Sequence, residues 1–280
     1  MRFGVHCRLW TKAWTSADLD LLDHAKELGF AALEISLGNL ENIEPPKIRT
    51  RAEKVGIEVI SALGLSKEYA LATPDVDTRR RTVEFLKTAV SELRDMGGRL
   101  FGGMFYAVPG RFSGTGPTTD ELSWLAEGIR EVAVFALGCG VSLAIEPVNR
   151  YETYLLNTAA EAQALIDRID EPNLGLLLDT YHMNIEERGI ASTIIRHGAK
   201  LRHLHLNESD RGTLGGGNIE WPSIFSALEQ IGYTGMASIE VFGCPSPQTP
   251  AITPIWRKLF PSPDQMARDG LAFLSRHATQ

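Results

Sequence analysis

The fold is decided by residues 143–152, which read LAIEPVNRYE. A short, mostly apolar run, Ser142 to Ile145, ends on the carboxylate of Glu146. Pro147 then ends the strand, because proline has no N–H for a sheet ladder and disfavours a helical residue before it. Many α/β barrels build their active sites from acids delivered at the C-terminal ends of buried strands. The segment therefore predicts a strand that carries a functional group.

The same pattern occurs three more times downstream, where short apolar runs end on Asp179, His205 and Glu240. In a closed barrel the C-terminal ends of the strands converge on one face, so these groups are expected to lie beside Glu146. Three carboxylates and one imidazole suit one divalent ion, and mostly oxygen donors favour Mn²⁺, Mg²⁺ or Co²⁺. The alternative is that each group merely ends its strand and faces solvent. That reading is the better one for a single residue, but four residues in register favour a metal site.

Outward from these strands, the chain alternates short apolar runs with helical patterns. Strands are predicted at residues 3–6, 32–35, 58–62, 100–105, 142–145, 174–179, 201–206 and 236–240. Helices are predicted at residues 18–28, 46–55, 77–96, 120–137, 159–169, 190–197 and 222–231, with a last helix ending near residue 276. Ser16 is the expected N-cap of the first helix and Gly29 its C-terminal stop. An irregular, proline-rich tail is expected at residues 245–263.

Eight such units in 280 residues predict a single (β/α)8 barrel domain spanning residues 1–280, since barrels of this kind have about 250 residues. A doubly wound open sheet would be expected to carry a glycine-rich turn after its first strand. Here the first strand is followed by residues 8–11, RLWT, which contain no glycine. The closed barrel is therefore favoured.

Composition limits the partners and the compartment. The net charge of −7 argues against nucleic acid and an anionic membrane surface, because both attract basic proteins. No apolar run approaches the roughly 20 residues of a membrane span, and the N-terminus lacks a signal-peptide pattern. Three cysteines, Cys7, Cys139 and Cys244, are too few and too scattered for a disulfide framework. The expected location is the cytoplasm.

Several motifs resemble the ketose 3-epimerases, the D-tagatose and D-psicose 3-epimerases of the xylose-isomerase-like barrel superfamily. The resemblance covers nearly the whole chain and is carried by residues 4–14, 146–152, 156–158, 178–187, 205–211 and 239–240. It implies one Mn²⁺ or Co²⁺ per subunit, bound by Glu146, Asp179, His205 and Glu240. It also implies a sugar substrate and a homodimer or homotetramer.

The resemblance further implies that Glu146 and Glu240 form the acid/base pair, and that Glu152, His182 and Arg211 contact the C1–C3 end of the sugar. Two bases on opposite faces of the substrate would invert a carbon beside a ketone, through an enediolate stabilised by the metal. His6 stands where relatives usually have an aromatic residue, and is expected in the substrate site near C4–C6.

Other residues near strand ends receive weaker assignments. We expect His203 to face the opposite side from His205 and to pack in the core, and we assign no catalytic role to Glu34 or Glu208. Four aromatic residues either line an apolar wall of the site or pack in the core and rim, and the two interpretations are equally supported: Trp10, Trp14, Phe105 and Tyr106. Residues 105–109 also lack a tryptophan that many relatives carry, which leaves the choice of ketose open.

The leading hypothesis is therefore a metal-dependent 3-epimerase of a free ketose. The nearest alternative is an aldose–ketose or sugar phosphate isomerase on the same metal-binding barrel. A phosphorylated substrate is less favoured, because no phosphate cradle is evident apart from the backbone of residues 215–217. A DNA repair endonuclease is disfavoured by seven histidines in total and an acidic chain, and a non-enzymatic sugar-binding protein by the complete acid/base set.

Overall fold

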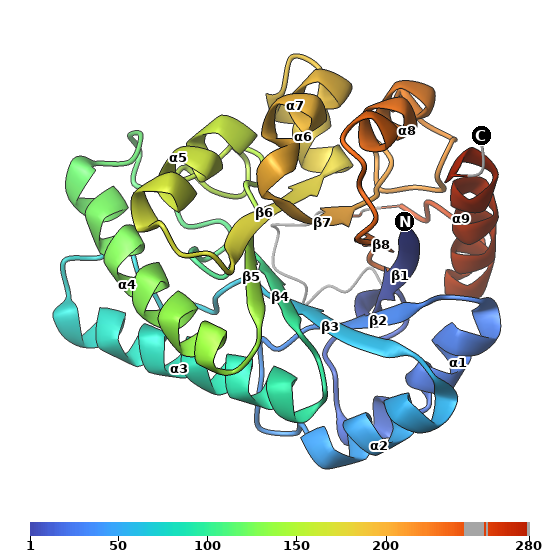
Figure 1. Ribbon diagram of the computed structural model, residues 1–280, viewed down its shortest axis with the longest axis horizontal. Helices are drawn as coiled ribbons and strands as arrows, with labels where there is room; N and C mark the ends of the chain where they lie inside the picture. The colour runs from blue at the N-terminus through green and yellow to red at the C-terminus, as the bar shows by residue number, and fades with distance from the viewer. Residues whose placement is uncertain (244–254, 256, 279–280) are drawn as a thin grey trace.

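The computed structural model describes residues 1–243, 255 and 257–278. Its eight strands are parallel and close into a barrel in chain order (Figure 1). Their bounds are β1 (Arg2–His6), β2 (Ala32–Ile35), β3 (Glu58–Ala62), β4 (Leu100–Gly103), β5 (Ser142–Ile145), β6 (Leu174–Asp179), β7 (Leu201–His205) and β8 (Met236–Ile239). Strand β1 pairs with both β2 and β8, which closes the cylinder. The predicted single-domain (β/α)8 barrel is confirmed.

The helices lie around the outside of the strands (Figure 1). Those in the described part of the chain are α1 (Leu21–Leu28), α2 (Pro45–Val55), α3 (Val76–Asp95), α4 (Thr119–Gly138), α5 (Ala159–Ile169), α6 (Thr180–Glu186), α7 (Ile190–His197), α8 (Trp221–Gln230) and α9 (Pro263–Ala278), with 3-10 turns η1 (Cys7–Leu9), η2 (Ser16–Asp18) and η3 (Gly198–Lys200). Most predicted helices are confirmed to within a residue or two, but α6 was not predicted. Most of the predicted irregular tail, namely residues 245–254 and 256, lies outside the described residues.

Helix ends show why these segments start and stop where they do. Helices α4 and α5 both begin with a capping box, in which the Thr118 and Thr158 hydroxyls accept from the N–H of the glutamate three residues later. Gly29 ends α1 with φ of +101°, a left-handed conformation that glycine adopts without a Cβ clash. The prediction of Ser16 as N-cap was wrong. Thr15 caps the 3-10 turn η2 instead, and α1 begins only at Leu21.

The barrel interior is apolar at one end and polar at the other. Ala32, Ile60 and Met236 pack together where the strands begin. Fully buried polar side chains, including Glu34 and His205, lie towards the C-terminal ends of the strands. Because buried charges are retained only when they are paired or bind ligands, the C-terminal face is the part of the barrel to search for a site.

Candidate metal centre and active site

The four predicted metal ligands lie together at the C-terminal face. Asp179 and His205 are the last residues of β6 and β7, while Glu146 and Glu240 directly follow β5 and β8. Each residue offers one ligand atom, and these atoms all lie within 4.8 Å of one another. Parallel strands of similar length bring their C-terminal ends to one rim, so one position per strand is enough to assemble this cluster.

Two distances show which ring nitrogen of His205 faces the carboxylates. His205 Nδ1 lies 3.1 Å from Glu146 Oε1 and 3.6 Å from Glu240 Oε2, so this nitrogen faces the carboxylates. Asp179 Oδ2 accepts from Asn207 Nδ2 at 2.9 Å, and its Oδ1 accepts from the Tyr181 N–H at 2.7 Å. The backbone bond makes Asp179 the N-cap of α6, which fixes the rotamer of the carboxylate.

The pKa values show that the carboxylates are crowded. Burial raises the pKa of Asp179 to about 7, although Arg211 opposes the shift. Burial also raises the pKa of Glu146. For Glu240 burial is outweighed by His205 and Arg211, which lower its pKa to about 2. A divalent cation would offset the mutual repulsion of three buried carboxylates, and oxygen donors with one imidazole suit Mn²⁺, Co²⁺ or Mg²⁺. The donor set therefore fits the expected ion.

A second buried group lies behind His205. His205 Nε2 lies 3.0 Å from Glu34 Oε1, and His203 Nε2 lies 3.3 Å from Glu34 Oε2. His203 Nδ1 lies 2.9 Å from the carbonyl oxygen of Met236, which can only accept, so this nitrogen carries a proton. The expectation that His203 faces away from His205 was wrong, because residues two apart in a strand share a face. Glu34 fixes the ring orientation that leaves Nδ1 of His205 directed at the cluster.

On the solvent side, Arg211 joins the metal cluster to the predicted substrate residues. Its Nη1 donates to Glu240 Oε2 at 3.0 Å, and its Nη2 lies 3.6 Å from Asp179 Oδ2 and 3.2 Å from His182 Nε2. The guanidinium also stacks on Tyr181, with Cζ 4.3 Å from the ring centroid. Two acids and an aromatic ring thus hold the cation rigidly over the cluster.

His182 and Glu152 lie next to this guanidinium. Nδ1 of His182 accepts from the Asn149 N–H at 3.2 Å, and burial together with Arg211 lowers its pKa well below the usual value, so the ring is neutral. Glu152 Oε1 accepts from Asn149 Nδ2 at 3.1 Å, and burial raises the pKa of Glu152 to about 7. Asn149 therefore orients both residues, a role that the sequence analysis did not assign.

The loop that presents Arg211 is organised around Glu208, which is fully buried. Its Oε1 accepts from the Gly215 N–H at 3.0 Å and from Trp221 Nε1 at 2.7 Å. Arg211 itself has φ of +58°, a conformation uncommon for a residue with a side chain. The network around Glu208 stabilises a backbone that would otherwise relax, so this carboxylate supports the site without contacting it.

A cavity of about 180 Å³ opens above the cluster. Six of the predicted site residues line it: Glu146, Glu240, Glu152, His182, Arg211 and His6. Its other lining residues include four with larger or polar side chains: Arg8, Ser36, Met104 and Phe242. Its volume is below the roughly 300 Å³ of drug-sized sites, which suits a small polar ligand.

The aromatic residues proposed for an apolar wall do not contribute to this cavity. Trp10, Trp14, Phe105 and Tyr106 are absent from the described lining, which favours the packing interpretation. The Tyr106 hydroxyl donates to the carbonyl oxygen of Glu146 at 3.0 Å and lies 3.3 Å from that of Leu156. Tyr106 therefore stabilises the backbone at the end of β5.

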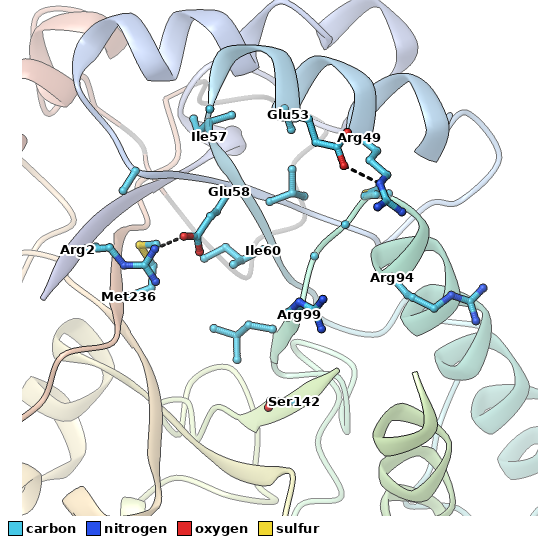
Figure 2. Close-up of a pocket in the computed structure, with 18 of the residues that line it drawn as sticks. Arg2, Arg49, Glu53, Ile57, Glu58, Ile60, Arg94, Arg99, Ser142 and Met236 are labelled. Atoms are coloured by element: carbon cyan, nitrogen blue, oxygen red, sulfur yellow. Dashed lines mark hydrogen bonds and ion pairs between the residues drawn. The ribbon is translucent and has the colours of Figure 1, made fainter. Parts of the chain in front are cut away.

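A larger cavity, about 1070 Å³, lies at the opposite end of the barrel, where the strands begin (Figure 2). Its rim carries ion pairs between Arg2 and Glu58 and between Arg49 and Glu53. Both metal-ligand clusters found in the described residues lie elsewhere. The chemistry therefore belongs to the smaller cavity at the C-terminal face.

A parallel barrel with a possible metal-binding cluster at its C-terminal rim defines the class of barrel enzymes whose active sites lie on that face. Within that class, residues 22–277 match the family model described as xylose isomerase-like TIM barrel. The chain belongs to this family, in its ketose 3-epimerase branch, and is an enzyme of the isomerase class.

Three relatives illustrate the similarity. The chain is 32% identical over 274 residues to a probable ketose 3-epimerase of Synechocystis, covering 98% of this chain and 96% of that protein. It is 34% identical over 276 residues to an L-ribulose 3-epimerase of Mesorhizobium japonicum, covering 98% and 93%. The crystal structure of D-psicose 3-epimerase with D-tagatose from Clostridium cellulolyticum H10 superposes with a TM-score of 0.92 at 30% identity, covering 99% of each chain.

No helix in the described part of the chain is long and apolar enough to cross a membrane.

Proposed function

We propose that this enzyme inverts C3 of a ketose through an enediolate, with Glu146 and Glu240 as the two acid/base groups and a divalent ion bound by Glu146, Asp179, His205 and Glu240. The observation that carries the proposal is the placement of both glutamates in the wall of one small cavity, on strand ends three strands apart around the barrel. Relatives named as ketose 3-epimerases support the same reaction.

The two glutamates have different surroundings, which suits opposite roles. Glu146 lies against His205, and burial raises its pKa in the metal-free protein. Glu240 accepts from Arg211, and its low pKa keeps it ionised. In either direction, one glutamate takes the C3 proton and the other returns a proton to the opposite face.

When bound, the divalent ion supplies Lewis-acid stabilisation of the negative charge that develops on the ketone oxygen. Arg211 adds a fixed positive charge beside it, held by Glu240 and stacked on Tyr181. His182 is neutral and Glu152 lies next to it, so together they offer hydrogen-bonding groups for the C1–C3 hydroxyls. His6 lines the same cavity and is assigned to the C4–C6 end.

The test is proton exchange at C3 in D₂O, followed for each C3 epimer separately. With two bases on opposite faces, Glu240→Gln should still exchange the C3 proton of one epimer without forming the other. Glu146→Gln should exchange only the opposite epimer. Full epimerase activity in either variant would contradict the two-base mechanism, and formation of an aldose by the wild type would favour the isomerase alternative.

We also propose that the enzyme is a cytoplasmic homodimer or homotetramer. Tyr151 and Phe112 are large apolar side chains, exposed on the loops after β5 and β4. An isolated β-bridge between Arg111 and Thr153 joins these two loops. Exposed apolar groups clustered on neighbouring loops are typical of subunit contacts. Light scattering would contradict this proposal if the protein remained monomeric at micromolar concentration.

A further inference from the structure

Arg8 places a guanidinium in the wall of the substrate cavity. The residue lies in the 3-10 turn η1 directly after β1, where its N–H donates to His6 Nδ1 at 3.1 Å and its carbonyl accepts from the Gly243 N–H at 3.1 Å. The guanidinium carbon lies 4.6 Å from the ring centroid of Phe242. The two hydrogen bonds fix the main chain of Arg8, and the Phe242 ring holds the half-buried guanidinium at the cavity.

Within the part of the chain that the structure describes, this guanidinium makes no ion pair. The other charged groups in the cavity wall are engaged: Arg211 donates to Glu240, Glu146 faces His205, and Glu152 accepts from Asn149. Burial lowers the pKa of Arg8, yet a guanidinium stays charged at any physiological pH. Partial burial of this cation costs free energy, which the charge of Glu240 offsets only in part because no ion pair forms, and a bound anion would offset it further.

The polar neighbours of Arg8 in the wall supply donors. Nδ1 of His6 accepts from the Arg8 N–H, so the ring proton of the neutral imidazole lies on Nε2. Burial lowers the pKa of His6 to about 4, so the ring is neutral at pH 7. The hydroxyl of Ser36, which follows β2, lines the same cavity and has no hydrogen-bond partner among the described residues. Guanidinium, imidazole N–H and hydroxyl together form a set that matches an oxyanion.

This donor set is distinct from the metal cluster. It comes from the ends of β1 and β2, whereas the metal ligands come from β5 to β8. Arg8 and Arg211 both lie against Phe242, with guanidinium carbons 4.6 Å and 4.9 Å from its ring centroid. A ligand whose ketone end lies under Arg211 would direct its other end towards Arg8.

We propose that Arg8, with His6 and Ser36, forms an oxyanion subsite, so that the preferred substrate is a ketose bearing a carboxylate or phosphate at the end remote from the ketone. The inference rests on the proposed epimerase function and adds a substrate class to it. C3 inversion of an uncharged ketose needs only the metal end of the cavity, whereas the subsite sets the preference among ketoses. The earlier expectation of an uncharged substrate took no account of Arg8.

The test compares three matched sugars, D-fructose, D-fructose 6-phosphate and D-fructuronate, in which a carboxylate replaces the C6 hydroxymethyl group. The expected result is a kcat/KM at least about tenfold higher for one of the charged sugars than for D-fructose, the size of effect typical of a hydrogen bond between charged groups. The charged sugar with the higher kcat/KM shows whether phosphate or carboxylate is the group bound. If neither charged sugar had a kcat/KM above that of D-fructose, the proposed subsite would be overturned.

Variants separate the subsite from general charge effects. Arg8→Gln should lower the ratio of charged to uncharged kcat/KM by about ten- to a hundredfold, and Arg8→Lys should retain part of it. Arg99→Gln is the matched control, because Arg99 is an exposed arginine at the opposite end of the barrel (Figure 2), and it should leave the ratio unchanged. A ratio unaffected by Arg8→Gln would overturn the assignment.

The wild-type comparison needs no variant, so the proposal stays testable if Arg8→Gln fails to fold. Failure of the subsite and failure of the proposed function are also distinct. If D-fructose is epimerised and the charged sugars show no higher kcat/KM, only the proposed subsite is wrong. If none of the three sugars is epimerised at C3 with Mn²⁺ present, the same assay is run with tagatose, ribulose and their terminal phosphates. Absence of C3 epimerisation for all of these sugars would contradict the proposed function itself.

Discussion

Replacing Glu34 by glutamine tests whether the buried pair behind the cluster positions His205, which we propose as a metal ligand. Glu34 is fully buried and lies between the two imidazoles, 3.0 Å from His205 Nε2 and 3.3 Å from His203 Nε2. Glutamine keeps the shape and one acceptor oxygen, but it removes the negative charge and places an amide group towards one of the rings. The substitution therefore changes the hydrogen bonding of His205 without opening a cavity.

The expected magnitude follows from the partners that are lost. Outer-shell partners of metal-binding histidines typically contribute about 10- to 100-fold to metal affinity, because they fix the ring orientation and raise its basicity. That factor corresponds to about 1.4–2.8 kcal/mol of binding free energy. Glu34 has two imidazole partners, so we expect the dissociation constant for Mn²⁺ to rise towards the upper part of this range, and Glu34→Ala to have a larger effect.

Isothermal titration calorimetry of the metal-stripped protein with Mn²⁺ measures the dissociation constant directly and does not depend on turnover. Asn173→Ala is a control, because Asn173 is also buried but lies just before β6, at the far end of that strand from Asp179, and donates to the carbonyl oxygens of Ala133 and Val141. We expect that control to lower thermal stability while leaving the Mn²⁺ dissociation constant unchanged. Equal Mn²⁺ affinity in the wild type and Glu34→Gln would refute the positioning role and leave Glu34 as a packing residue.

Three further outcomes are expected. Burial raises the pKa of Glu152 to about 7 from 4.5, so the folded metal-free protein holds this proton more tightly than the unfolded chain, and stability falls as pH rises through that interval. Urea denaturation at pH 5 and pH 8 should show a loss of about 2.5 kcal/mol from this group, which Glu152→Gln removes. Mn²⁺ at a hundredfold excess over Kd should stabilise the wild type by about 2.7 kcal/mol, and differential scanning fluorimetry should show a smaller shift for Asp179→Asn at the same concentration. Tyr106→Phe should cost about 1–3 kcal/mol in urea denaturation, because the Glu146 carbonyl loses its buried donor.

The barrel could be predicted from the sequence because its strands are short apolar runs with clear ends. Strands β2, β3 and β5 have the predicted bounds, and β4 ends two residues early, at Gly103. Helix α6 was missed because it begins on Thr180, directly after the strand, and is capped by the carboxylate of Asp179. A residue that ends a strand, caps a helix and faces the metal cluster gives no separate signal for each role.

The clustering of Glu146, Asp179, His205 and Glu240 could be predicted because one barrel rim collects one position from each strand. The pair behind it could not, because residues 34 and 203 are 169 positions apart and meet only across the closed barrel. The strand period alone would have placed His203 on the same face as His205, so that part of the error lay in how the rule was applied. Arg8, Ser36 and Phe242 lie just beyond strand ends, where side-chain directions follow no period.

The central claim is tested most directly by a crystal structure with Mn²⁺ and a bound ketose, using anomalous scattering to locate the metal. We expect one manganese peak among Glu146, Asp179, His205 and Glu240, with the sugar's C3 lying between the two glutamates. An empty cluster in crystals that contain Mn²⁺, or both glutamates on the same face of the sugar, would contradict the mechanism.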